Sequence, residues 1–340
     1  MSVTDVTYST GMVHARYSPA RLIAAVVVPI LVLTALVGLS SPAAGGSPGA
    51  RAIATVSGHL RFGVTLPGGP LASAAVADVA KLAGERPSVE MWYEDFAQPV
   101  PLAELNAVAS RGAMPVVTWE PWLWGGGVNQ PKYALDRITA GDHDSYIRAW
   151  AAGLRNWGRP VTLRFAHEMN GSWYPWAEGV NGNGAGDYVA AWRHVHNVMS
   201  AAGASNVSWM WSPNTPPTGP VPLSRLYPGA SYVDAVALDG YNWGTTQSWS
   251  RWTSPGMLFG QGISELRVLA PGKPIMIGET ASAETGGSKP AWIRDLLGYL
   301  SAQQDVSAFI WFQHNKETDW RFDSSAASRS AFAGALVARR

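Results

Sequence analysis

The feature that most constrains the fold is an uninterrupted alternation of short apolar runs and helix-length segments from residue 59 onward. Strand-like runs rich in β-branched and aromatic residues occupy 60–65, 88–93, 114–119, 161–167, 206–211, 233–239, 274–278 and 307–312. Helical patterning occupies 72–84, 101–112, 142–157, 186–203, 257–270, 290–303 and 324–338, while 223–227 is too short to indicate a helix by itself. This alternation implies a parallel sheet, and eight units in roughly 280 residues predict a single (β/α)8 TIM barrel over 59–340.

The N-terminal part of the chain has a different character. Residues 22–39 (LIAAVVVPILVLTALVGL) carry no charge and follow Arg16 and Arg21, so 1–39 is predicted to be an export signal or signal anchor. Cleavage and membrane anchoring both stay open, because the run is longer than a usual signal core and just reaches a membrane span. In either case the basic flank predicts an extracellular location, secreted or anchored outside. The Ser/Pro/Gly/Ala-rich stretch 40–58 is predicted to be a flexible linker.

Composition points to a neutral ligand. The 25 basic and 24 acidic residues give a formal charge of +1 without long runs of either sign, which argues against a nucleic-acid partner. Cys is absent, which excludes disulfides, a thiolate nucleophile and a cysteine-ligated metal. Many of the 17 Trp stand beside Gly, Pro, Asn or Glu, a pattern that suggests sugar-stacking platforms in addition to core packing.

Polar and aromatic residues gather where the predicted strands end. In a (β/α)8 barrel the chemistry lies at the carboxyl ends of the strands. Those ends read Trp92-Tyr93-Glu94-Asp95, Trp119-Glu120-Pro121-Trp122, His167-Glu168, Asp239-Gly240-Tyr241-Asn242-Trp243, Gly278-Glu279-Thr280 and Trp311-Phe312-Gln313-His314.

Two of these carboxylates form the natural pair. Glu168 stands in RFAHEMNGSWYPW, where a strand delivers a carboxylate into an aromatic loop that can raise its pKa and stack on sugar rings. Glu279 ends the seventh strand, opposite the fourth, so both can approach one glycosidic bond. Arg164 points into the barrel and needs a buried partner, for which the candidates are Glu94, Asp95, Glu120 and Asp239.

Four motifs in order, AHEMNGSWYPW, GYNWG, MIGETA and KETDWRFDSS, resemble glycoside hydrolase family 26. This family comprises retaining endo-glycanases such as β-mannanases, lichenases and some xylanases. The resemblance covers nearly all of 60–337 and implies Glu168 as acid/base and Glu279 as nucleophile. It also implies that Tyr241 hydrogen-bonds the nucleophile, that His167 stands beside the acid/base, and that sugars contact Trp311, Trp320, Arg321, Trp173 and Trp119. MNGSWYPWA is closer to the lichenase-like bacterial branch than to mannanases.

We therefore expect retaining endo-hydrolysis of a β-linked polysaccharide, β-1,4-mannan first. The alternatives are mixed-linkage β-1,3-1,4-glucan as the substrate and a catalytically silent carbohydrate-binding barrel. A silent barrel would keep Trp platforms but has no need of two Glu at opposed strand ends. A zinc site of the HExxH type would need His where Gly171 stands. We expect no metal, no cofactor and a monomer.

Overall fold

The computed structural model of the protein describes residues 59–339. The predicted export segment and linker lie outside this range. Within 59–339, no helix is both long enough and apolar enough to cross a membrane.

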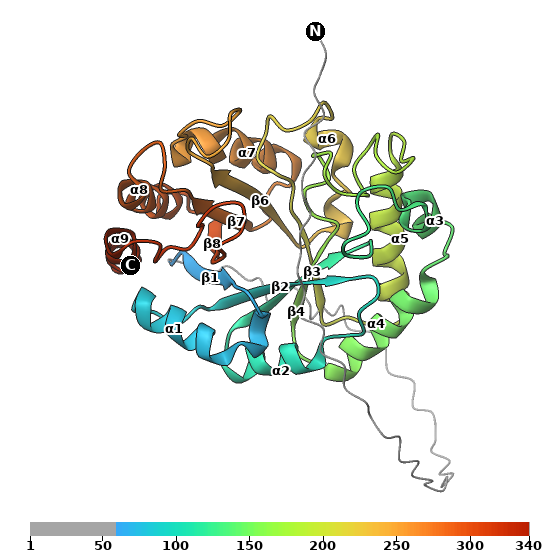
Figure 1. Ribbon diagram of the computed structural model, residues 1–340. Helices are drawn as coiled ribbons and strands as arrows, with labels where there is room; N and C mark the ends of the chain where they lie inside the picture. The colour runs from blue at the N-terminus through green and yellow to red at the C-terminus, as the bar shows by residue number, and fades with distance from the viewer. Residues whose placement is uncertain (1–58, 340) are drawn as a thin grey trace, which may run out of the picture. The chain divides into compact units, whose positions relative to one another are not determined.

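The predicted barrel is confirmed. Eight strands in residues 59–339 form a closed barrel in chain order, each parallel to its neighbours, and β8 pairs back to β1 (Figure 1). The strands are Arg61–Thr65 (β1), Val89–Asp95 (β2), Met114–Glu120 (β3), Val161–Phe165 (β4), Val207–Trp211 (β5), Ala235–Asn242 (β6), Ile275–Ser282 (β7) and Val306–Phe312 (β8).

Helices surround the barrel (Figure 1). They span Ser73–Ala83 (α1), Leu102–Ser110 (α2), Leu135–Thr139 (α3), Asp144–Trp157 (α4), Asp187–Ala201 (α5), Leu223–Leu226 (α6), Pro255–Leu269 (α7), Lys289–Ser301 (α8) and Ala326–Ala338 (α9). Helices α7, α8 and α9 begin after Ser254, Ser288 and Ser325, whose side chains each accept a backbone N–H of the first turn. The one-turn α6 explains the weak signal at 223–227, and α3 is a five-residue helix that the sequence pattern did not predict.

Strand alternation divides the apolar core into two layers. Side chains of one parity fill the barrel interior: Val89, Met91, Met114, Val116, Met210, Ala235, Ala237, Met276, Ala308 and Ile310. Side chains of the other parity pack between the barrel and the helices, together with the buried helix faces. The inward parity continues upward into Thr118, Arg164 and Asp239, which are fully buried. A polar layer therefore closes the barrel interior below its carboxyl end.

Candidate active site

A local irregularity in β7 places Glu279 at the barrel mouth. Leu238 on β6 pairs with Ile277, but the next residue, Asp239, pairs with Glu279, so β7 carries one extra residue. That extra residue is Gly278, where a Cβ would lie 2.6 Å from Asp239 Oδ1 and 2.7 Å from the Ser212 hydroxyl. Only glycine fits this approach. Gly278 and Glu279 therefore both face the barrel interior, and the absence of a side chain at 278 leaves the space below Glu279 to Asp239 and Ser212.

Three donors converge on the Glu279 carboxylate. Arg164 Nη1 donates to Oε1 at 2.7 Å and Tyr93 OH donates to the same oxygen at 2.8 Å. Tyr241 OH donates to Oε2. A charge-assisted bond and two phenol hydroxyls suit an anionic carboxylate held in one orientation, which is what a nucleophile needs.

Arg164 is anchored beneath Glu279 by a second carboxylate. Its Nη2 lies 2.5 Å from Asp239 Oδ2, and both side chains are fully buried. The Ser212 hydroxyl donates to Asp239 at 2.9 Å. Of the four candidate partners for Arg164, Asp239 is the one the structure selects, with Glu279 beside it. A buried guanidinium needs such compensation, because charge taken out of water without a partner is costly.

Glu168 stands on a strained turn at the end of β4. The strand ends at Phe165, two residues before the predicted end, because Ala166 has φ 44° and Glu168 has φ 51°. This left-handed region costs a non-glycine residue about 1–3 kcal/mol and is found where function needs an unusual geometry. The Glu168 N–H donates to Ser212 O at 2.8 Å, which ties the turn to the end of β5.

The surroundings of Glu168 favour a carboxyl group that holds its proton near neutral pH. Burial raises the pKa of Glu168 to about 7, and the negative charge of Glu279 acts in the same direction. Trp173 Nε1 donates to Oε2 and Asn214 Nδ2 to Oε1, each at 2.7 Å. These two hydrogen bonds favour the ionised form and lower the pKa of Glu168, but the effect of burial outweighs them. The two glutamates therefore have the different environments that separate a proton donor from an anionic partner.

Comparison with known proteins supports the resemblance seen in the sequence. The family described as Glycosyl hydrolase family 26 matches residues 106–254. Endoglucanase H of Acetivibrio thermocellus is 36% identical over 320 residues, which cover 92% of this chain and 33% of the relative. The chain belongs to glycosyl hydrolase family 26. It spans only about a third of the length of that relative. The family match includes Glu168 and Tyr241 and ends before Glu279.

Two mannanases are also similar to parts of this chain. Mannan endo-1,4-beta-mannosidase A and B of Caldalkalibacillus mannanilyticus is 39% identical over 94 residues, 26% of this chain and 18% of the relative. The catalytic domain of the Bacillus sp. JAMB-750 GH26 endo-beta-1,4-mannanase shares the fold with a TM-score of 0.61 at 19% identity. That match covers 82% of this chain and 85% of the mannanase domain.

The structure corrects the placement of Trp119 and Trp311. Both indoles are fully buried on outward-facing strand positions, where no sugar can reach them. Trp119 stacks on Trp150 with ring centroids 4.7 Å apart, and Trp311 packs against Phe332 at 5.1 Å. The prediction was wrong because successive side chains of a strand point to opposite faces of the sheet. On β8, Ala308 and Ile310 face the interior, so Trp311 faces the helices. The next inward side chain is therefore Phe312.

Trp173, Trp320 and Arg321, in contrast, come from loops at the barrel mouth. Trp173 is partly exposed beside Glu168, to which it donates. The Trp320 ring lies 5.1 Å from the Tyr241 ring but is 1% exposed. The Arg321 guanidinium is paired with Asp319, to whose carboxylate Nε and Nη2 donate at 2.8 and 2.6 Å. Trp173 and Arg321 can border a bound sugar, although the Arg321 guanidinium is already hydrogen-bonded to Asp319. Trp320 packs beneath this surface and offers almost no exposed indole.

Lys289 holds the loop that carries Trp320 and Arg321. Its buried ammonium group donates to Asp319 O at 3.1 Å, to Arg321 O at 2.7 Å and to the Ser324 hydroxyl at 2.9 Å. Burial lowers the pKa of Lys289 to about 8. These three bonds join the start of α8 to the loop between β8 and α9.

His167 lies beneath the turn that carries Glu168 and does not line an open surface. Its side chain is 1% exposed, and Nε2 lies 3.0 Å from Tyr174 OH. Within residues 59–339, Nδ1 has no hydrogen-bond partner, although Glu120 Oε1 lies 3.9 Å away. Burial first, and then the Arg164 charge, hold the pKa of His167 well below its usual range, so the ring is neutral.

Sequence reasoning did not assign two residues that contact the glutamates. Tyr93 was recognised only as part of the polar end of β2, whereas its hydroxyl reaches Glu279. Asn214 follows β5, a strand end at which no candidate residue was predicted. Its side chain donates to Glu168. The run Ser212-Pro213-Asn214 directly after a buried strand is the signal that could have found it.

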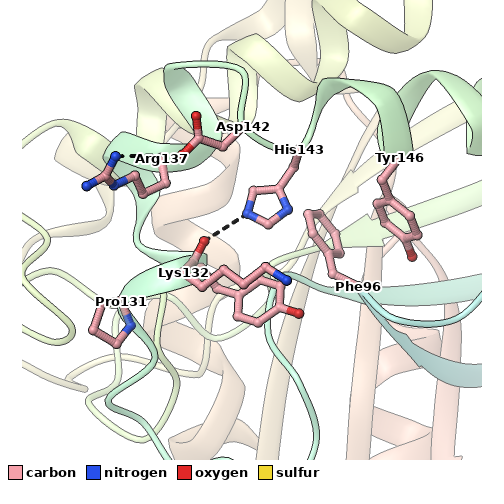
Figure 2. Close-up of a pocket in the computed structure, with 8 residues that line it drawn as sticks. Phe96, Pro131, Lys132, Arg137, Asp142, His143 and Tyr146 are labelled. Carbon is pink, nitrogen blue, oxygen red and sulfur yellow. Dashed lines mark hydrogen bonds and ion pairs between the residues drawn. The ribbon is translucent and has the colours of Figure 1, made fainter.

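A pocket of ≈ 520 Å³ lies elsewhere, between the end of β2 and the segment 131–146 (Figure 2). It is lined by Phe96, Pro131, Lys132, Tyr133, Arg137, Asp142, His143 and Tyr146. His143 Nε2 lies 2.9 Å from Lys132 O, and Asp142 lies 3.8 Å from Arg137. With one carboxylate in its lining, this pocket does not offer the pair that glycoside hydrolysis needs.

Proposed function

We propose that the domain hydrolyses internal bonds of a β-linked polysaccharide with retention of anomeric configuration. The observation that carries the proposal is the contrast between the two glutamates at the barrel mouth. Glu279 receives three donors, whereas burial raises the pKa of Glu168 to about 7. A carboxylate held in one orientation by three donors and a second carboxyl group with a raised pKa are what a double displacement requires.

In the first step, Glu279 attacks the anomeric carbon and a covalent glycosyl-enzyme ester forms. The bond from that carbon to the leaving oxygen breaks, and the leaving oxygen takes the proton of Glu168. Tyr93, Tyr241 and Arg164 hold the attacking carboxylate in position. Formation of the ester removes the negative charge of Glu279, which was raising the pKa of Glu168.

In the second step, Glu168 acts as the base. It takes a proton from water, the water oxygen bonds to the anomeric carbon, and the ester bond to Glu279 breaks. Glu279 leaves as a carboxylate and its three donors stabilise it again. Two inversions at the same carbon give net retention.

Two substrates have specific support. β-1,4-Mannan is favoured by the similarity to proteins named mannan endo-1,4-beta-mannosidase, which covers 26% of this chain. β-Glucan is favoured by the similarity to a protein named Endoglucanase H, which covers 92% of this chain. The two sugars differ in the orientation of the 2-hydroxyl, so side chains around the cleaved unit decide between them. We place mixed-linkage or β-1,4-glucan beside mannan as a substrate candidate.

One experiment tests the reaction and the substrate together. The protein is incubated with mannan, glucomannan, mixed-linkage glucan and xylan, and product sizes are determined by chromatography. On the best substrate, NMR follows the anomeric configuration of the first product, which we expect to be β. A first product of α configuration would rule out double displacement, and products released only as terminal units would rule out internal cleavage.

The pH dependence gives a second test of the roles. The acid step needs protonated Glu168, so kcat/KM is expected to fall as pH rises through about 7. Burial also raises the pKa of Glu120 to about 7, which makes Glu120→Gln the necessary control. We expect the alkaline limb at the same pH in wild type and Glu120→Gln. Loss of the limb in Glu120→Gln would assign the titration to Glu120 instead.

For location, we propose that the enzyme works outside the cytoplasm. The support is the uncharged run 22–39 with its preceding arginines. A polymeric substrate is consistent with this location.

A further inference from the structure

The loop between β6 and α7 presents an indole to solvent. Trp249 is 55% exposed, and its ring lies 5.3 Å from that of Trp243 at an interplanar angle of 59°. Trp249 is the one Trp among the exposed large apolar side chains of residues 59–339. Holding so much indole surface in water costs free energy, and single exposed apolar residues are common, so exposure alone decides nothing.

What distinguishes Trp249 is a continuous row of rings that leads to the candidate nucleophile. The Trp243 centroid lies 4.8 Å from that of Trp320, and Trp320 lies 5.1 Å from Tyr241. Tyr241 in turn donates to Glu279. These ring contacts connect Tyr241, beside the candidate nucleophile, through the buried Trp320 to the partly exposed Trp243 and the exposed Trp249.

The loop that carries the two indoles is held in one conformation. Gly244 has φ +55°, and a Cβ there would lie 1.8 Å from Thr285 O in the loop after β7. The Ser250 hydroxyl lies within hydrogen-bonding distance of Gly244 O, and the Thr246 hydroxyl donates to Trp243 O at 2.7 Å. A rigid aromatic platform loses little conformational entropy when a ligand stacks on it.

The chemistry of the loop suits a neutral polyol. Residues 243–250 read WGTTQSWS, with hydroxyl and amide groups between the indoles and no charged side chain. Indole faces pack on the apolar faces of pyranose rings, while hydroxyls and amides can hydrogen-bond to the sugar's rim.

We propose that Trp243 and Trp249 form a distal sugar-binding platform. It takes a pyranose unit of the same chain that is cleaved between Glu168 and Glu279, at a distance from the scissile bond. This inference rests on the proposed function, because it assumes that one polysaccharide chain reaches from the cleavage site to this loop.

Binding as a function of ligand length tests the platform. The full chain carrying Glu279→Gln serves as the parent, so that oligosaccharides are not consumed. Calorimetry measures the Kd of manno-oligosaccharides and mixed-linkage gluco-oligosaccharides from disaccharide to hexasaccharide. Trp249→Ala is expected to raise the hexasaccharide Kd by about 5- to 30-fold and to leave the disaccharide Kd within about twofold. Trp249→Phe, which keeps a ring, is expected to restore most of the affinity.

The matched control is Val268→Ala. Val268 is an 81% exposed apolar residue near the other end of α7 and should change no Kd. Equal Kd values for the parent and Trp249→Ala at every length would overturn the platform, as would an equal loss at every length. Length-dependent binding by a wild-type protein that cleaves no polysaccharide would support the platform and reject the proposed hydrolysis.

Discussion

Glu279→Ala is expected to lower kcat on polysaccharide by about 10⁴- to 10⁶-fold, the loss typical of removing one of several groups that act together in a covalent hydrolase. Without the carboxylate no glycosyl-enzyme can form, and Arg164, Tyr93 and Tyr241 face an empty position. The measurement is reducing-sugar release from the best polymer. Thermal unfolding followed by circular dichroism shows whether the variant is folded, since Arg164 keeps Asp239 as a partner.

A small anion can replace the missing carboxylate. In Glu279→Ala, added azide is expected to attack an aryl β-glycoside directly and give the α-glycosyl azide, because only one inversion occurs. Glu265→Ala, which removes a carboxylate from the outer surface of α7, is the control and should keep full activity. More than about 1% residual activity in folded Glu279→Ala would contradict the assignment, since it is far above the expected remainder.

Glu168→Ala is expected to lower kcat/KM on polysaccharide by about 10²- to 10⁴-fold, the contribution typical of general acid catalysis. An aryl glycoside with an activated leaving group needs no protonation, so its first step should be nearly unaffected. The second step slows because the base is missing. A burst of aryl alcohol in stopped-flow measurements, followed by slow turnover, is the expected trace.

Azide again separates the two roles. In Glu168→Ala it should accelerate turnover and give the β-glycosyl azide, because it attacks an ester already formed with one inversion. Opposite azide configurations in the two variants would identify the nucleophile and the acid/base within one assay. An equal loss on polymer and on activated substrate would argue against the role of Glu168.

Much of the architecture could be predicted because it depends on local patterns. Each strand and each long helix of the described region carries its own periodicity, so both appeared within a few residues of their predicted bounds. The polar strand ends followed from the same pattern, and with them Glu168 and Glu279. Two tryptophans that were wrongly predicted to contact sugar show what residue type alone does not determine. Trp119 and Trp311 have the residue type of a sugar contact, but their strand parity sends them into the layer beneath the helices.

The sequence by itself determined the barrel, the end that carries the polar residues and the two glutamates, because strand period and chain order are encoded locally. Only the tertiary structure decided what surrounds those glutamates. The extra residue at Gly278 reverses the parity of β7, and the left-handed turn at Glu168 ends β4 early. Tyr93 comes from β2, Arg164 from β4 and Asn214 from the end of β5. Their contacts depend on barrel closure, which brings residues far apart in the chain within hydrogen-bonding distance and excludes the water that would weaken their interactions.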